Sequence, residues 1–303
     1  MYLYHFGFSE LPFTLTPNTG FYCELQGHEE ALQVLSTALK TGEGFIKVTG
    51  EVGTGKTILC RKLLNEISNH FVTAYVPNPY LNPNELRHAI AAELGVEYDD
   101  EADPHQLTRL IEQKLLEINN SGHSVVLIID EAQALPTDSL EALRLFSNLE
   151  TETRKLVQLV MFGQPELDER LATRELRQLR QRIGFSYRLS TLREEELKRY
   201  IRHRAKRAGY KGPELFPDEV VSWLHQGSRG VPRLVNLLTH KSLLLAYGNG
   251  RHTVTVADIK AAIADTEDAT MPKKQDWLWF TIGFAAVCAG MLGLAVSLGW
   301  INL

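Results

Sequence analysis

The chain has 303 residues, of which 44% are hydrophobic and 23% are charged, close to the composition of ordinary globular proteins. This composition excludes a largely disordered chain, and the length suffices for two modest globular units. The formal net charge of −5 disfavours a general nucleic-acid binder, which usually carries a basic surface. The three cysteines, Cys23, Cys60 and Cys288, lie far apart and match neither a disulfide framework nor a zinc motif.

The N-terminal sequence, MYLYHFGFSELPF, lacks the features of a secretory signal. It has no basic region followed by an apolar run and a cleavage site of small residues. We therefore expect the first globular region to lie in the cytoplasm.

A phosphate-binding loop is predicted between a short strand and a helix. The apolar run at residues 45–48 indicates a buried strand, and residues 58–67 carry apolar side chains at helical spacing. Between them lies a complete GxxxxGK[ST] motif in the context that nucleotide-binding loops require, which an ordinary glycine-rich turn rarely matches. The predicted nucleotide-binding residues are Gly50, Glu51, Val52, Gly53, Thr54, Gly55, Lys56, Thr57 and Ile58.

The residue types in this motif suit a nucleotide phosphate. Glycines let the backbone N–H groups of the loop approach phosphate oxygens closely. Lys56 is expected to contact the β- and γ-phosphates, and the Thr57 hydroxyl to bind Mg²⁺. The motif therefore predicts ATP and Mg²⁺ as the cofactors.

Two acidic residues follow a later apolar run. Residues 71–76 and 124–129 indicate further core strands, with helices predicted at residues 83–94 and 105–118. Asp130 and Glu131 come directly after the second of these strands, at the strand end where α/β sheets gather ligands. Asp130 is a candidate Mg²⁺ ligand and Glu131 a candidate general base. Solvated turn acids are the alternative, but the upstream P-loop favours hydrolysis.

A polar residue ends the next predicted strand in the same way. After a helix at residues 137–149, residues 156–162 form an apolar run that leads to Gln164 and Pro165. Gln164 is a candidate contact of the γ-phosphate or its attacking water, and a polar helix start before Pro165 is the alternative. Alternation of strands and helices predicts a parallel sheet covered by helices.

The C-terminal third of the globular region is predicted to be entirely helical. Helices are expected at residues 193–208, 217–226, 231–247 and 256–264. The first of them is rich in lysine and arginine. A solvated helix face is one interpretation, and contact with anionic lipid headgroups is the other.

Residues 277–301 predict a membrane-spanning helix. This run has no charged residue, and as a helix it would be about 37 Å long, against about 30 Å of bilayer hydrocarbon. Trp277 and Trp300 lie near its ends, and Lys273 and Lys274 precede it. This arrangement predicts a cytoplasmic N-terminal part and a periplasmic C-terminus, whereas a buried core helix is the alternative.

Several segments together resemble one family. HFGFSELPFTLTPNTGFYCE, HEEAL, GEVGTGKT, DEAQ after VVLIID, FGQPEL and SRGVPRLVN occur in an order similar to that of the GspA/ExeA group of AAA+ ATPases. The resemblance implies an α/β P-loop NTPase AAA+ core with a parallel sheet between helices, an all-helical lid, and one C-terminal transmembrane helix. We divide the chain accordingly into a core (1–190), a lid (191–268), a juxtamembrane linker (269–276) and a span (277–301).

The resemblance also implies roles for single residues. Residues 50–57 would be Walker A, Asp130 and Glu131 Walker B, and Gln164 the first sensor. Arg233, which follows Gly230-Val231-Pro232, would be the lid's sensor arginine, with an ordinary surface arginine as the alternative. The arginine finger would be one of three residues, and Pro12, Phe13 and Tyr22 would lie near the adenine. We choose Arg182 as the finger, over Arg180 and Arg177.

The implied function is a membrane-anchored ATPase. Within the group, the sequence is most similar to members that serve MSHA-type (type IV) pilus biogenesis. The implied partners are other copies of the chain in a ring, pilus or secretion proteins of the bacterial inner membrane, and the lipid bilayer, with no nucleic acid. Alternatives are a nucleic-acid-directed AAA+ ATPase and a non-hydrolysing, ATP-gated adaptor. Because the sequence stops at Leu303, the periplasmic peptidoglycan-binding domain of the group's founding members is not expected.

Overall fold

The computed structural model describes residues 2–77, 80–99, 103–150 and 155–271. The chain separates into two compact units, Met1–Thr270 and Met271–Leu303, and every helix and strand named below belongs to the first. Within the described residues, no helix combines the length and the apolar character needed to cross a bilayer. The predicted span at residues 277–301 lies outside the described residues, as does most of the predicted linker.

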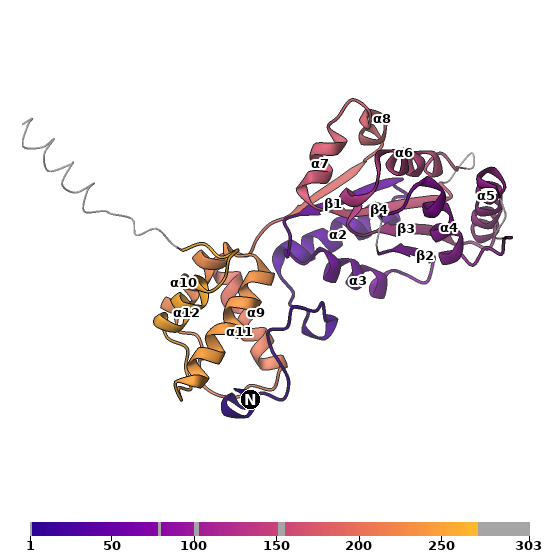
Figure 1. Ribbon diagram of the computed structural model, residues 1–303. Helices are drawn as coiled ribbons and strands as arrows, with labels where there is room; N and C mark the ends of the chain where they lie inside the picture. Colours follow the sequence, from indigo (N-terminus) through magenta and orange to yellow (C-terminus); the bar gives the residue numbers. More distant parts are fainter. Residues whose placement is uncertain (1, 78–79, 100–102, 151–154, 272–303) are drawn as a thin grey trace, which may run out of the picture. The chain divides into compact units, whose positions relative to one another are not determined.

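A five-stranded parallel sheet forms the centre of the N-terminal part (Figure 1). Its strand order is β2-β3-β4-β1-β5. The strands are β1 (Phe45–Gly50), β2 (Phe71–Val76), β3 (Ser124–Ile129), β4 (Val157–Gly163) and β5 (Phe185–Leu189). Because β4 lies between β1 and β3, the segments that follow these three strands meet at one edge of the sheet. The predicted parallel sheet is confirmed.

Helices cover both faces of the sheet. One face packs against α2 (Gln26–Lys40) and α3 (Lys56–Glu66). The other face packs against α4 (Pro83–Glu93), α5 (Pro104–Asn120), α6 (Thr137–Phe146), α7 (Pro165–Leu171) and α8 (Arg177–Gln181). Successive residues of β3 enter opposite clusters, Val126 and Ile128 on one face and Leu127 and Ile129 on the other. Burial on both faces explains why this strand is apolar throughout.

Four helices, which we call the C-terminal helices, follow the sheet. They are α9 (Glu194–Arg207), α10 (Asp218–Ser228), α11 (Pro232–Gly248) and α12 (Val256–Ala264). Their bounds lie within two residues of the predicted ranges. A cluster of buried side chains lies between them, including Leu197, Leu224, Val235 and Ile259.

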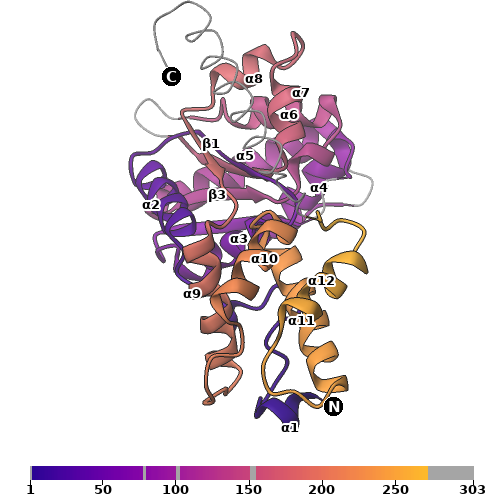
Figure 2. The ribbon, with the colours of Figure 1, turned by 90° about the vertical axis from the view of Figure 1, so that its left-hand side faces the viewer.

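Residues 2–25, which we call the N-terminal segment, complete the core of the C-terminal helices. This segment contains α1 (Tyr2–Phe6) and the short 3-10 helix η1 (Thr19–Phe21). Its aromatic side chains join the cluster of the four helices, and Figures 1 and 2 show the segment beside α11. Our division of the sequence placed these residues in the core (1–190), with the sheet.

Several hydrogen bonds fasten the N-terminal segment to the C-terminal helices, three of which illustrate the contact. The Tyr2 hydroxyl lies 2.9 Å from Nδ1 of His240 on α11. The Ser9 hydroxyl donates to the carbonyl oxygen of Ala208 at 2.8 Å. The Arg204 Nε donates to the carbonyl oxygen of Pro12 at 2.6 Å. Apolar burial and polar contacts therefore both assign the segment to the helices.

Candidate nucleotide-binding site

The loop between β1 and α3 has the backbone geometry that its glycines permit. Gly53 and Gly55 have φ angles of 81° and 101°, in the left-handed region that disfavours residues with a Cβ. A Cβ on Gly53 would lie 2.5 Å from Cβ of Arg233, and one on Gly55 would lie 2.8 Å from Nε2 of His28. Two other elements therefore approach this loop too closely for any side chain at these positions.

Lys56 begins α3 and lies under the loop. Its side chain is buried, and its ammonium donates to the carbonyl oxygens of Gly50 at 2.7 Å and Glu51 at 3.0 Å. Burial lowers the pKa of Lys56, while the negative charges of Glu131 and Asp130 oppose this shift. The loop thus holds a desolvated cation at the place where the motif predicts phosphate oxygens.

Asp130 and Glu131 follow β3 at the same edge of the sheet. Asp130 is buried, and the Thr57 side chain hydrogen-bonds to it. Burial raises the pKa of Asp130, and the hydrogen bonds from Thr57 and the Glu131 amide act in the opposite direction. The structure therefore brings together the two side chains predicted to bind Mg²⁺, and a hydroxyl beside a carboxylate is an oxygen donor set that suits this hard cation.

Glu131 adopts a rare backbone conformation. Its φ angle is 52°, and it is one of two non-glycine residues with a positive φ in the described chain. Such conformations cost about 1–3 kcal/mol and concentrate at functional sites. The turn directs the chain from β3 into the 3-10 helix η2 (Ala132–Ala134).

Two glutamine side chains hold the Glu131 carboxylate. Gln133 Nε2 donates to Glu131 Oε2 at 2.6 Å, and Gln164 Nε2 donates to the same oxygen at 3.0 Å. The Gln133 Oε1 also accepts from the backbone N–H of Gln164 at 3.0 Å. Sequence reasoning selected Gln164 but missed Gln133, although Gln133 belongs to the DEAQ motif. Its role depends on the backbone turn at Glu131, and no sequence pattern predicts that turn.

A pocket of about 380 Å³ lies over the loop. This volume suits a small ligand. Predicted residues that line it are Val52, Gly53, Gly55, Lys56, Thr57, Ile58, Glu131, Gln164, Arg233 and Tyr22. Four others, Gly50, Glu51, Thr54 and Asp130, belong to the loop or lie beside it without lining the pocket.

Arg233 approaches the loop from the C-terminal helices. Its backbone N–H donates to the Gly53 carbonyl oxygen at 3.2 Å, at the first turn of α11. Its exposed side chain lines the pocket with Lys56 and Glu131. The predicted sensor position is therefore close to the loop.

The far end of the pocket contains residues that the sequence did not reveal. Tyr22 lines it, whereas Pro12 and Phe13 do not: Phe13 packs against Phe216 in the core of the C-terminal helices. His28 is buried beside the loop, and its Nε2 lies 3.1 Å from the Thr54 carbonyl oxygen. Further lining residues are Thr14, Pro17, Asn18, Tyr200, Arg204 and Asn236.

The three candidate finger arginines lie away from this pocket. All three side chains are exposed, on or directly after α8. Arg182 donates from Nη1 to the Ser147 hydroxyl at 3.1 Å. None of the three lines the pocket of its own chain, so a contribution to catalysis would require the pocket of another copy.

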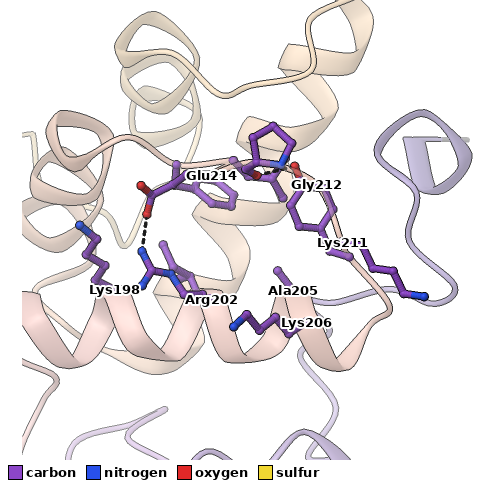
Figure 3. A pocket seen from close by; sticks show the side chains of 12 residues that line it. Lys198, Arg202, Ala205, Lys206, Lys211, Gly212 and Glu214 are labelled. Atoms are coloured by element: carbon purple, nitrogen blue, oxygen red, sulfur yellow. Dashed lines mark hydrogen bonds and ion pairs between the residues drawn. The ribbon is translucent and has the colours of Figure 1, made fainter.

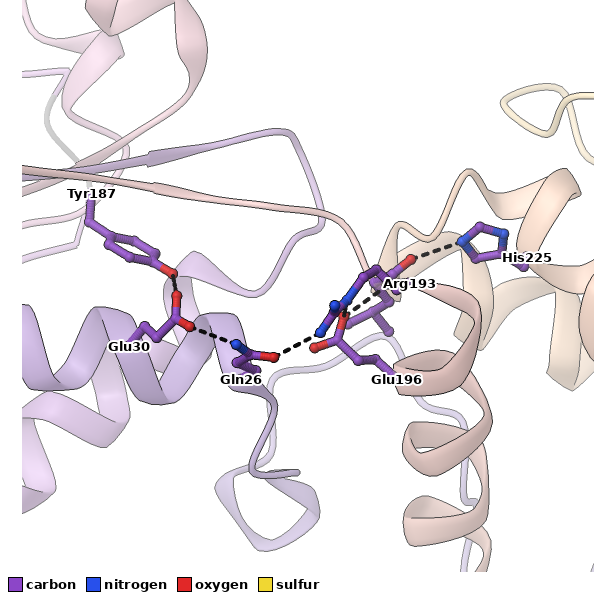
Figure 4. Close-up of polar contacts among 7 residues, drawn as sticks. Gln26, Glu30, Tyr187, Arg193, Glu196 and His225 are labelled. Carbon is purple, nitrogen blue, oxygen red and sulfur yellow. Dashed lines mark hydrogen bonds and ion pairs between the residues drawn. The ribbon is translucent and has the colours of Figure 1, made fainter.

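A chain of polar contacts connects α2, β5 and α9 (Figure 4). The Tyr187 hydroxyl donates to Glu30 at 2.9 Å, and Gln26 Nε2 donates to the same carboxylate at 2.9 Å. The Gln26 Oε1 accepts from Arg193 Nη2 at 2.8 Å, and the Arg193 backbone N–H donates to Glu196 at 3.0 Å. The chain passes between the sheet and the C-terminal helices twice, once just before α2 and once just before α9. These contacts join the two crossing segments.

Comparisons with known proteins fit this geometry. A family described as "AAA domain" matches residues 39–171, which contain the loop, Asp130, Glu131 and Gln164. The general secretion pathway protein A of Aeromonas hydrophila is 38% identical over 300 residues. That alignment covers 99% of this chain and 53% of the relative, so the chain spans about half the relative's length.

Solved structures show the same fold at low identity. The ORC2 protein of Aeropyrum pernix, solved as ADPNP–ADP complexes, has a TM-score of 0.61 at 16% identity and covers 85% of this chain and 73% of its own. Cdc6p of Pyrobaculum aerophilum has a TM-score of 0.62 at 21% identity, with 82% and 70% covered. These likenesses establish an α/β P-loop NTPase fold of the AAA type. The alignment to general secretion pathway protein A and the AAA-domain match place the chain in the GspA/ExeA-like family of AAA-domain proteins.

Proposed function

We propose that this protein hydrolyses ATP with Mg²⁺. One observation carries the proposal: Glu131 lies beside the phosphate-binding loop and is oriented by Gln133 and Gln164. A protein that only bound ATP would have no need of a carboxylate held this way. Family membership supports nucleotide binding, and the position of Glu131 supports hydrolysis.

We assign a step to each group. Both glutamine amides contact Oε2 of Glu131, so Oε1 is the oxygen that accepts a proton from water. That water attacks the γ-phosphorus, the bond to the bridging β–γ oxygen breaks, and ADP and phosphate leave. Lys56 stabilises the charge that develops on the phosphate oxygens. Thr57 and Asp130 would hold Mg²⁺, which supplies further charge stabilisation when bound.

The C-terminal helices would act as the lid over the nucleotide. Arg233 lines the pocket and its backbone contacts Gly53, so closure would carry its guanidinium to the γ-phosphate. Arg182 would act in the pocket of a neighbouring copy, with Arg180 and Arg177 as alternatives. Catalysis would then depend on assembly into a ring.

The proposed setting is the bacterial inner membrane. The apolar residues 277–301 would anchor the chain there, with the ATPase part in the cytoplasm and the C-terminus in the periplasm. The similarity to general secretion pathway protein A of A. hydrophila supports a role in secretion, and type IV pilus assembly is the more specific role that we propose. Hydrolysis would drive or regulate assembly of that apparatus.

The test is ATP turnover by residues 1–271, which contain the compact unit Met1–Thr270 with its own core. We expect Mg²⁺-dependent hydrolysis that rises steeply with protein concentration, because the finger comes from a second copy. Lys56→Ala should lose both binding and turnover, whereas Glu131→Gln should bind ATP and lose turnover by about a factor of 10² or more. Glu117→Gln, an exposed change on α5, is the matched control and should leave both unchanged.

Other outcomes have distinct meanings. Tight ATP binding without turnover at any concentration would contradict hydrolysis and leave an ATP-gated adaptor. Turnover that appears only when DNA or RNA is added would favour a nucleic-acid-directed ATPase.

A further inference from the structure

A second pocket lies within the C-terminal helices, between α9 and the segment that leads to α10. Its volume is about 390 Å³, within the range of small-ligand sites. Figure 3 shows Lys198, Arg202 and Lys206 along α9, with Lys211 and Glu214 on the facing segment. None of these five residues lines the nucleotide pocket.

The floor of this pocket is apolar. Ile201, Ala205, Leu215 and Phe216 line it, and each side chain is no more than 5% exposed. These residues belong to the core of the C-terminal helices, which fixes their positions. A ligand that fills the pocket must therefore present an apolar group to the floor, because a polar group there would lose its hydration without a partner.

One wall of the pocket is preformed. The Tyr210 hydroxyl donates to the Pro213 carbonyl oxygen at 2.6 Å and closes the turn between the helices. A Cβ on Gly212 would lie 2.6 Å from that hydroxyl, so this turn packs directly around the Tyr210 side chain. The position of Lys211 within the turn follows from these contacts.

The rim carries more positive than negative charge. Arg202 pairs with Glu214 at 2.7 Å, and Lys198 pairs with Asp218. For Lys206 and Lys211, no carboxylate of the described residues lies within ion-pair distance. Two exposed ammonium groups thus lie beside the apolar floor, where they can form ion pairs with carboxylates of another molecule.

We propose that this pocket binds an acidic peptide segment of a partner protein. One bulky apolar side chain of the segment enters the pocket, and flanking carboxylates contact Lys206 and Lys211. Charge complementarity selects the acidic residues, and the recessed floor selects a protruding side chain. The recessed apolar floor favours this occupant over a lipid headgroup, which would meet the charged rim but leave the floor unfilled. The proposal is independent of ATP hydrolysis.

The test measures binding of a fluorescein-labelled peptide, built of two glutamates, one phenylalanine and two glutamates, to the full chain in nanodiscs of neutral phospholipid. We expect saturable binding, read as fluorescence anisotropy, that weakens as salt rises. The double variant Lys206→Gln/Lys211→Gln should weaken it about tenfold, because both ion pairs with the carboxylates of the peptide are lost. Replacing the peptide's phenylalanine with serine should weaken it by a similar factor.

The matched control is Arg109→Gln/Lys114→Gln, which removes the same charge from α5, far from the pocket in the sequence and in the fold. It should leave peptide affinity unchanged. Equal loss in both double variants would overturn the site and indicate nonspecific charge attraction. Equal affinity for the peptide with serine in place of phenylalanine would overturn the apolar site. Loss of peptide binding when phosphatidylserine is included in the nanodiscs would overturn the proposal in favour of a lipid contact.

Discussion

At the scale of single residues, the candidate site depends on how Glu131 is held. The carboxylate follows a buried strand, turns through a positive φ and accepts two amide hydrogen bonds. The turn and the two glutamines have the same effect, because each restricts the orientation of the Glu131 carboxylate. Gln133 is the more informative of the pair, since its side chain contacts both Glu131 and the backbone of Gln164.

Removing Gln133 should damage turnover more than binding. We expect Gln133→Ala to lower kcat by about 10- to 100-fold, within the range for a positioned general base, while ATP affinity changes less than about threefold. Gln133 does not line the pocket, so a binding defect has no structural cause. The measurement is kcat beside the ATP Kd, with exposed Gln106→Ala on α5 as control. Equal losses in kcat and affinity would show that the loop itself had collapsed.

The sequence analysis predicted the site residues that belong to a recognisable motif. Lys56, Thr57, Asp130 and Glu131 follow from the loop pattern and from acids after a strand, and the structure brings all four together. Gln133 escaped prediction because its contact depends on the conformation of one residue. Their catalytic roles remain predictions, which the kinetic experiments above test.

At the scale of elements, the N-terminal segment is the main departure from the sequence analysis. Strands and later helices were predicted from periodicity, and most of their bounds match. Residues 2–25 carry little regular structure, so periodicity could not show that their aromatic side chains pack against helices far along the chain. The helix α2 was also missed, although Ala31, Leu35 and Ala38 are spaced for one buried face.

The contact between α1 and α11 predicts a pH-dependent stability. Burial lowers the pKa of His240, whose Nδ1 faces the Tyr2 hydroxyl. The unfolded chain, with a histidine pKa of about 6.5, then binds the proton first as the pH falls. The contribution of the neutral histidine to the free energy of unfolding is therefore complete above about pH 6.5 and is lost as the pH falls below that value. Burial lowers the pKa of His28 and His203 as well, so all three histidines act in the same direction.

The measurement is the urea midpoint of residues 1–271 at pH 7.5 and pH 5.5. His240→Gln should reduce the difference between the two midpoints, because one of the contributing histidines is gone. The exposed His105→Gln on α5 is the control and should not reduce it. If His240→Gln left the difference unchanged, the Tyr2 contact would not couple protonation to folding.

At the scale of the whole molecule, two compact units have different expected roles. Residues 1–270 form one unit that contains the sheet, the pocket and the C-terminal helices. The remainder includes the apolar residues 277–301. The sequence predicted the parallel fold well because buried strands and helix faces have strong local signatures. Membrane anchoring stays a prediction, because it falls on residues outside the described ranges.

Deleting residues 272–303 should separate anchoring from folding. We expect the full chain to stay in the membrane fraction after an alkaline carbonate wash, and the shortened chain to appear in the supernatant. Far-ultraviolet circular dichroism and ATP binding of the shortened chain should show a folded protein, because its clusters of buried side chains are intact. Extraction of the full chain by carbonate would contradict an integral anchor.

The shared core of the two chain ends has a consequence for biosynthesis. Tyr2 and His240 are 238 positions apart, and a ribosome that adds about 5–20 residues per second needs roughly 10–50 s to cover that distance. Throughout this interval Tyr2 lacks its contact with α11, and the core that the N-terminal segment shares with the C-terminal helices is incomplete. The nascent chain therefore presents an unsatisfied apolar surface until α11 and α12 emerge, which makes it a natural client for chaperones that act at the ribosome.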